Sequence, residues 1–158
     1  MNTLSAPDEL TSVELLTRAL VGLTMHSVDI LGGTVTLTQF RLLLVLESLG
    51  EVPSSRLAAE LGMVPSSVTR LAGRLATAGL LARGADGRSR SIVTLAVTDA
   101  GRELVERVVS RRRELLAAVL DQMEPEERRL MAAVAARFAA LSGQPTAALA
   151  GPAGPLPL

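Results

Sequence analysis

Three polar side chains recur at helical spacing in the stretch GMVPSSVTRLAGRL: Ser67, Arg70 and Arg74. An arginine fork can donate hydrogen bonds to phosphate oxygens or to the edge of a guanine, and a serine hydroxyl can bind either a phosphate or a base. A matching apolar row lies on the other side of the same stretch, formed by Val68, Leu71 and Leu75. One side is therefore suited to a protein core, and the other is either a nucleic-acid surface or a solvated face.

Two consecutive helices must position this polar row. Pro65 suits the first turn of a helix and Gly79 suits a left-handed residue just past its end, so the row lies on a helix over about 65–78. The preceding stretch SSRLAAELG predicts a short helix over 54–61 that stops at Gly62. Two short helices joined by a glycine-containing turn are typical of a helix-turn-helix, whose second helix enters the major groove of DNA.

The polar residues of both helices are the candidate DNA contacts. The second helix would place its hydroxyls on phosphates or bases, and its arginines on guanine edges or phosphates. The first helix would approach the DNA backbone with its N-terminal residues. The candidates are Ser66, Ser67, Thr69, Arg70 and Arg74 on the second helix, and Ser54, Ser55 and Arg56 on the first.

A β-hairpin is expected directly after the second helix. The stretch IVTLAVT alternates as a half-buried strand does, and Asp86-Gly87 marks a hairpin turn within GADGRSRS. Arg83, Arg88 and Arg90 lie around its tip, where an arginine can enter a minor groove. The hairpin is interpreted as the wing of a winged helix, with Arg88 and Arg90 as its DNA contacts. A hairpin edge that only adds solubility is the alternative.

Composition excludes most catalytic and metal chemistry. The 158 residues contain no cysteine and a single histidine, His26, so neither a thiol nucleophile nor a metal cluster of Cys or His residues can form. Tyr and Trp are absent, and two Phe residues cannot supply the stacking surfaces that single-strand or RNA readers use. Because no pair of nucleophile and base is visible either, we expect neither an enzyme nor a cofactor-dependent protein.

Length and hydropathy indicate one globular domain. The chain is long enough to bury a core, and 48% of its residues are hydrophobic. No apolar run approaches the length of a membrane span, and the N-terminal stretch MNTLSAPDEL is polar and acidic rather than a signal peptide. We therefore expect a cytoplasmic protein without a membrane partner.

The net charge of zero hides a segregation of charge along the chain. All sixteen basic residues are arginine, which favours forked contacts over diffuse charge. Residues 1–52 carry two arginines and six acidic residues, residues 53–102 carry seven and three, and residues 103–158 carry seven of each. The positive excess coincides with the helix-turn-helix and the hairpin, and it supports nucleic-acid binding.

Two helices are expected before the helix-turn-helix. Ser5 is interpreted as the cap of the first, with Asp8 three residues further on, and the paired glycines at 32–33 as its end. The second is expected to begin at Thr38 and to end at Gly50. Its continuous apolar run predicts burial on nearly all sides.

Two further helices and a tail are expected after the hairpin. Thr98 is the expected cap of a long helix that reaches about Leu120, and Pro125 opens the last helix. Apolar side chains recur at helical spacing along this last helix: Leu130, Val134, Phe138 and Leu141. From Gly143 onward the chain is rich in Pro, Gly and Ala, which predicts a flexible tail.

The chain resembles the MarR family of transcription regulators. The stretch SSRLAAELGMVPSSVTRLAGRLATAGLLAR is similar to that family's DNA-reading helices, and VTDAGRELV is similar to its LT-x-x-G-R exit from the wing into the fifth helix. The order of the expected elements agrees as well. The family's Asp-x-Arg motif usually lies closer to the third strand than Asp86-Gly87-Arg88 does here, so Arg88 and Arg90 both stay candidates for the minor groove.

The resemblance implies a fold and an assembly. The fold class is mainly α with a small β-hairpin wing: a winged helix-turn-helix flanked by terminal dimerisation helices. The implied regions are an N-terminal dimerisation helix over 1–33, a winged helix-turn-helix over 34–98, C-terminal dimerisation helices over 99–142 and a flexible tail over 143–158. The implied homodimer reads a near-palindromic site on double-stranded DNA.

From these features we expect a repressor that regulates transcription by binding DNA sequence-specifically and that a small ligand releases from the DNA. In the family that the chain resembles, this ligand is often an aromatic or phenolic acid. Arg18 and His26 lie about two turns apart on an otherwise apolar helix and could face a pocket for a carboxylate; surface or interface positions are the alternative for both. A winged helix used as an architectural or protein-interaction module, without sequence-specific DNA binding, is the alternative function.

Overall fold

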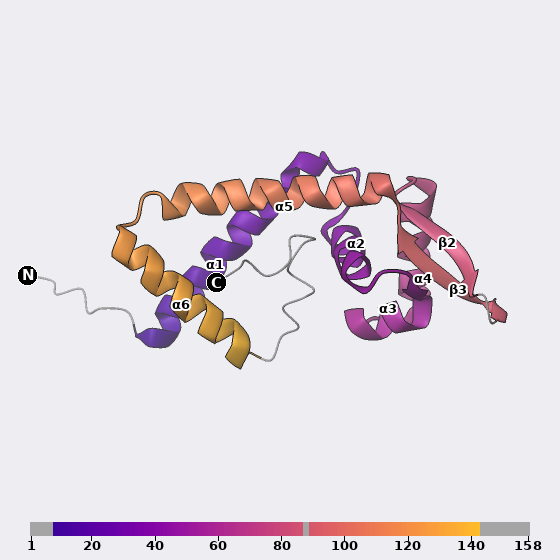
Figure 1. The fold of residues 1–158 in the computed structure, drawn as a ribbon, viewed down its shortest axis with the longest axis horizontal. Coiled ribbons are helices and arrows are strands. Elements are labelled where there is room, and N and C mark those ends of the chain that lie inside the picture. The colour runs from indigo at the N-terminus through magenta and orange to yellow at the C-terminus, as the bar shows by residue number, and fades with distance from the viewer. Residues whose placement is uncertain (1–7, 87–88, 143–158) are drawn as a thin grey trace, which may run out of the picture.

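The computed structural model describes residues 8–86 and 89–142. In Figure 1 the long helix α5 (Asp99–Leu120) runs along the molecule and joins two groups of elements. Helices α1 (Glu9–Val28) and α6 (Pro125–Leu141) form one group, and the helix-turn-helix with its hairpin forms the other. The remaining elements are η1 (Asp29–Leu31), α2 (Leu37–Leu49), β1 (Val52–Pro53), α3 (Ser54–Leu61), α4 (Pro65–Thr77), β2 (Leu81–Asp86) and β3 (Ser89–Val97).

Helix α2 lies at the centre of the core. It contacts α3, α4, α5 and β3, and every side chain of its apolar run, 42–46, is buried. Leu57 of α3, Leu75 of α4 and Val105 of α5 are fully buried in the same cluster. The continuous apolar sequence of α2 is therefore explained by partners on several sides, as predicted.

The sheet contains one strand that the sequence did not predict. Its order is β1-β3-β2, antiparallel throughout, with Val52 of β1 opposite Leu95 of β3. A strand of two residues is too short to show alternation, so no sequence pattern identifies β1. The Thr94 hydroxyl of β3 donates a hydrogen bond of 2.7 Å to the Glu51 carboxylate, which precedes β1 and adds a side-chain link at this edge.

The hairpin strands are longer than the sequence indicated. The expected turn covered 84–91, but β2 reaches Asp86 and β3 begins at Ser89. The backbone ladder continues through these residues with a register shift after Ala85, because backbone pairing does not require the apolar alternation from which the strand was predicted. Gly87, the second residue of the expected turn, lies outside the described residues.

The cap of α1 differs from the expectation. Asp8 is the N-cap, and its carboxylate accepts a hydrogen bond of 2.7 Å from the Thr11 backbone N–H. This hydrogen bond lowers the pKa of Asp8, since it favours the charged form. The helix therefore begins at Glu9, and the expected cap, Ser5, lies outside the described residues. At the other end, η1 intervenes before Gly32 closes the segment in the left-handed conformation.

The start of α2 also differs, by two residues. Thr36 is the cap instead of Thr38, because Gln39 stands three residues after Thr36 and completes a capping box. The Gln39 N–H donates to the Thr36 hydroxyl at 3.2 Å, and the Thr36 N–H donates to the Gln39 side chain at 2.9 Å. No such partner follows Thr38, which lies inside the first turn.

The apolar row of α6 is not covered by the part of its own chain that the structure describes. None of the residues of this helix is buried, and Phe138 is 60% exposed. Leu130, Val134 and Leu141 are exposed in the same way. The row that the sequence indicated is therefore present as a helical stripe, but it is not part of the core formed by residues 8–86 and 89–142.

Candidate DNA interface

Helix α4 is held rigidly by its apolar side. Val68, Ala72 and Leu75 are buried against the core, while Leu71 is half-buried against it. The turn before the helix is made possible by Gly62, whose φ of 63° is a left-handed conformation that suits glycine. Pro65 occupies the first turn, where its missing N–H leaves no hydrogen bond unmade. The predicted helix and its two-sided character are confirmed.

The polar side of α4 faces away from the protein. Ser66, Thr69, Arg70 and Arg74 are exposed, and Ser67 is half-buried. The Thr69 hydroxyl donates a hydrogen bond of 3.0 Å to the Pro65 carbonyl oxygen, so in this conformation it can accept a hydrogen bond from DNA but not donate one. The two arginines form no ion pair with any described residue, which leaves their guanidinium groups available to an external anion or base.

Helix α3 presents only part of its predicted set. Ser55 and Arg56 are exposed, whereas Ser54 is half-buried. Ser54 lines a cavity of about 90 Å³ together with Thr69 and Arg83, between α3, α4 and the hairpin. Ser54 therefore faces the neighbouring elements in part, while Ser55 and Arg56 face solvent.

Arg83 has a role that the sequence did not reveal. It lies on β2, and its Nη2 donates a hydrogen bond of 3.1 Å to the Thr69 carbonyl oxygen on α4. This bond ties the hairpin to the DNA-facing helix. In the sequence Arg83 lies near Arg88 and Arg90 around the hairpin tip, and only the folded arrangement shows its separate contact with α4.

The structure describes only part of the two predicted DNA contacts of the wing. Arg88 lies outside the described residues. The backbone of Arg90 belongs to β3 near its start, and its side chain also lies outside the description. The hairpin itself projects from the end of the molecule next to α4, as Figure 1 shows.

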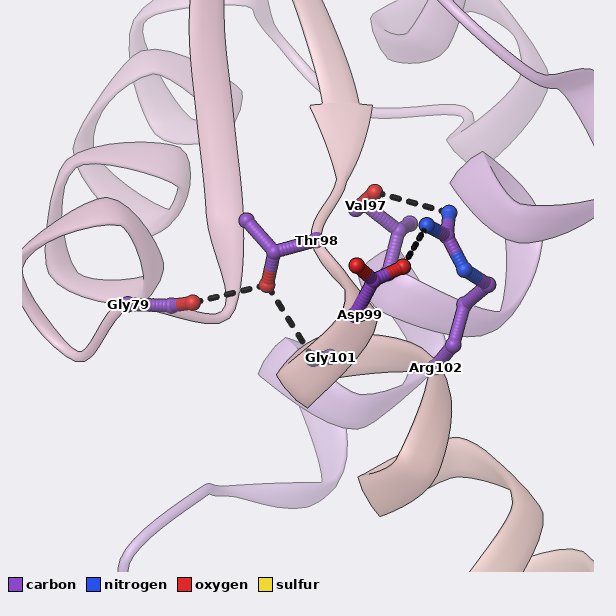
Figure 2. Close-up of polar contacts among 6 residues, drawn as sticks. All are labelled: Gly79, Val97, Thr98, Asp99, Gly101 and Arg102. Atoms are coloured by element: carbon purple, nitrogen blue, oxygen red, sulfur yellow. Dashed lines mark hydrogen bonds and ion pairs between the residues drawn. The ribbon is translucent and has the colours of Figure 1, made fainter.

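The TDAGR stretch joins the hairpin to α5 through a compact set of hydrogen bonds, drawn in Figure 2. The Thr98 hydroxyl accepts from the Gly101 N–H at 3.1 Å and donates to the Gly79 carbonyl at 2.7 Å. Arg102 donates to the Val97 carbonyl at 3.0 Å and pairs with Asp99. The end of α4, the end of β3 and the start of α5 are thereby fixed together.

Gly101 is required at this junction by space. A Cβ at this position would fall against the Leu80 carbonyl oxygen, well inside van der Waals contact, and 2.7 Å from Val97 Cγ1. The backbone of α5 thus packs directly on the residue before β2. This close approach gives a physical reason for the glycine of the LT-x-x-G-R pattern.

A partly buried carboxylate lies near the same junction. Glu47 of α2 has one carboxylate oxygen, Oε2, that is buried without a hydrogen-bond partner among the described residues. Burial raises the pKa of Glu47, and the nearby Arg102 opposes this rise. Since the raised pKa means that the folded state disfavours the ionised form, the contribution of Glu47 to stability decreases as pH rises through its titration range.

Neither Arg18 nor His26 lines either of the two hollows described for this structure. Both are exposed on α1. A hollow of about 630 Å³ lies instead between η1 and α5, where Ile30, Glu106 and Arg107 are among its lining residues, and neither Arg18 nor His26 lines it. Within the described part of the chain, no helix is long and apolar enough to cross a membrane.

A three-stranded sheet with a projecting hairpin, placed after a helix-turn-helix, defines a winged helix-turn-helix protein, and the predicted fold class is confirmed. The chain belongs to the MarR family, whose model matches residues 34–90. The HTH-type transcriptional repressor MdtR of Bacillus subtilis (strain 168) is 31% identical over 105 residues, which cover 66% of this chain and 68% of MdtR. The protein is thus a transcription regulator of this family and not an enzyme.

Solved structures agree with this assignment. RV1404 from Mycobacterium tuberculosis is 32% identical, with a TM-score of 0.79 over 91% of this chain and 100% of that chain. BpsR from Bordetella bronchiseptica, whose DNA binding is regulated by 6-hydroxynicotinic acid, has a TM-score of 0.61 over 91% of this chain and 99% of that chain. At 19% identity, BpsR shares the fold alone.

Proposed function

We propose that the protein is a dimeric repressor that binds a near-palindromic site on double-stranded DNA through α4. The observation that carries this proposal is the exposed, unpaired arginine row on a helix whose opposite side is fixed in the core. A rigid helix can hold forked donors at a fixed register against base edges, whereas a charged flexible segment can only follow phosphates. The repressor activity of MdtR, a relative at 31% identity, supports the direction of regulation.

The proposed contacts divide by element. The residues of α4 lie in the major groove, those of α3 approach the DNA backbone, and the wing arginines reach a minor groove or phosphates. The set comprises Ser66, Ser67, Thr69, Arg70 and Arg74 on α4, Ser54, Ser55 and Arg56 on α3, and Arg88 and Arg90 on the wing. Within it, Ser55 and Arg56 are better placed for DNA than Ser54, which is half-buried.

A second copy of the chain covers the apolar surfaces of α1 and α6. Large apolar patches exposed on a single chain are unfavourable in water and mark association surfaces. On these helices the exposed large apolar residues are Leu10, Val13, Leu15, Leu16, Leu20, Val21 and Met25 on α1, and Leu130, Val134, Phe138 and Leu141 on α6. Residues 1–33 and 99–142 therefore form the dimerisation region, and residues 34–98 the DNA-binding region.

Alanine substitutions of the α4 arginines and of the wing arginines are expected to have different effects on DNA binding. If Arg70 or Arg74 reads a guanine, its replacement by alanine should cost about 1–3 kcal/mol per half-site on the cognate duplex and flatten the preference at one base position. Arg88→Ala and Arg90→Ala should weaken binding to many sequences alike, and reduce the slope of log affinity against log salt by about 0.9 for each phosphate that the variant no longer neutralises.

Salt titrations of the wild type and these four single variants, on a cognate and a scrambled duplex, measure both quantities. Arg107→Ala on α5 is a matched control, since this exposed arginine belongs to neither proposed contact surface. Equal decreases in affinity for all four variants on both duplexes would mean that α4 binds charge without reading bases. The architectural function would then be the better account.

A small carboxylated aromatic compound is proposed as the releasing ligand, with Arg18 as its charge partner and His26 nearby. The regulation of BpsR by 6-hydroxynicotinic acid, in a protein with the same fold, supports this chemical class. Because Arg18 and His26 are exposed on the single chain, an enclosed site at α1 needs a wall from the second copy.

Arg18→Ala is expected to leave operator affinity within about twofold of wild type while it abolishes release by the ligand, because only the charge partner is removed. Release is measured by titrating a panel of aromatic acids into the protein–DNA complex. Unchanged release in the variant would remove Arg18 from the ligand site. His26→Gln tests the second residue in the same titration.

A further inference from the structure

Val64 is an exposed apolar residue on the DNA-facing end of the helix-turn-helix. It precedes α4 directly as the N-cap residue and is 63% exposed. Between Ser54 and Thr77, all of which the structure describes, the other large apolar side chains are buried or half-buried, namely Leu57, Leu61, Met63, Val68, Leu71 and Leu75. Val64 is thus the exception in a segment that otherwise covers its apolar groups.

Folding of α4 does not explain a valine at this position. An N-cap is stabilised by Ser, Thr, Asp or Asn, whose side-chain oxygen accepts an N–H of the first turn, and Val64 forms no such bond. A hydrophobic contact at a helix start is normally made by the residue before the cap, and here Met63 fills that role by packing against the core that includes Val68. Neither the cap nor this contact needs the isopropyl group of Val64.

The place of Val64 indicates what the isopropyl group can contact. Residues at the N-terminal end of a recognition helix contact base edges, and Ser66, in the first turn of α4, is exposed as well. In the major groove the apolar group that distinguishes one base pair from the others is the C5-methyl of thymine. A side chain without donors or acceptors can read that group and no other base edge.

We infer that Val64 is a specificity-determining residue that contacts a thymine methyl in each half-site, an inference that rests on the proposed function of α4. Binding transfers the exposed isopropyl group and the methyl out of water together. The contact selects a T·A pair at one position, beside the positions at which the arginines select guanine.

Replacement of thymine by deoxyuridine tests this contact, since it removes only the methyl group. The probe is the duplex recovered from a random-sequence pool by selection with the full-length wild-type protein, with each thymine replaced in turn. At one position per half-site, the replacement should weaken wild-type binding about fourfold, the factor for removal of one buried methyl-sized apolar group. Val64→Ala should be less sensitive to the same replacement than the wild type, because it keeps only the Cβ methyl, and Val64→Ile should stay as sensitive as the wild type.

The possible outcomes separate this inference from the proposed function. The thymine contact is overturned if deoxyuridine lowers the affinity of the wild type and of Val64→Ala equally, or if it lowers the affinity at no position. Sequence-specific binding by α4 would still stand in either case. A wild-type protein that selects no sequence overturns both. The thermal unfolding temperatures of both variants are compared with that of the wild type, and similar values show that a decrease in affinity does not come from misfolding. Val64→Ile provides the same check within the binding assay.

Discussion

Replacing Gly101 by alanine is expected to lower the free energy of unfolding by roughly 3 kcal/mol. The added Cβ would collide with the carbonyl oxygen of Leu80 and with the side chain of Val97. Because Leu80 contributes backbone, no rotamer change can relieve the collision, and α5 must move away from the start of β2. Chemical denaturation at a fixed protein concentration measures the change, since stability of an oligomer depends on concentration.

Gly22→Ala is the matched control. Gly22 lies inside helix α1, and a Cβ there meets no atom within 4 Å in the chain. Alanine in a helix interior is favoured over glycine by up to about 1 kcal/mol, so this variant should be as stable as the wild type or more stable. A Gly101→Ala protein with wild-type stability would show that the junction between wing and α5 is looser than the structure indicates.

Replacing Phe138 by aspartate is expected to convert the dimer to a monomer and to weaken operator binding at least a hundredfold. The ring is exposed on the single chain, within the apolar stripe of α6 that we propose a second copy covers. A charge buried in that surface without a partner is strongly unfavourable. A monomer binds only one half-site. It therefore lacks the increase in affinity that arises when a second, linked DNA-binding region binds the other half-site at a high effective concentration.

Sedimentation or light scattering distinguishes a mass of one chain, 16.5 kDa, from twice that value. Ala136→Asp introduces the same charge on the opposite side of α6 and should leave both the mass and the affinity unchanged. Were both variants dimeric, the apolar stripe of α6 would not be the interface. A wild-type protein with the mass of one chain at micromolar concentration would contradict the dimer altogether.

The elements whose boundaries depend on local chemistry could be predicted from the sequence. Pro65, Thr98 and Pro125 each act within one turn of their own helix, and the helices begin where these residues indicate. The two-sided character of α4 was predictable for the same reason, since helical periodicity shows directly which residues share a face. Thr36 and Thr38 are both suitable N-cap residues for α2, and the structure uses Thr36, which has a capping-box partner.

Features that depend on distant parts of the chain could not be predicted. The strand β1 is identified only by its pairing with β3, and Arg83 contacts Thr69 only because the hairpin folds back on α4. The glycine of the TDAGR stretch is part of a recognisable sequence pattern, but the physical reason for it is the Leu80 carbonyl, which is twenty-one positions before Gly101 in the chain. Periodicity gave the apolar stripe of α6 correctly, yet it does not tell whether the same chain or a second copy covers the stripe.

Whether α4 reads base sequence is decided by the affinity of the wild-type protein for two duplexes. One duplex is recovered by selection from a random pool, and the other is a scrambled sequence of the same length and composition, both at about 0.15 M salt. Base reading by α4 should make the selected duplex bind tighter by a factor of roughly 10³ or more. Equal affinities for the two duplexes would mean that α4 does not read base sequence.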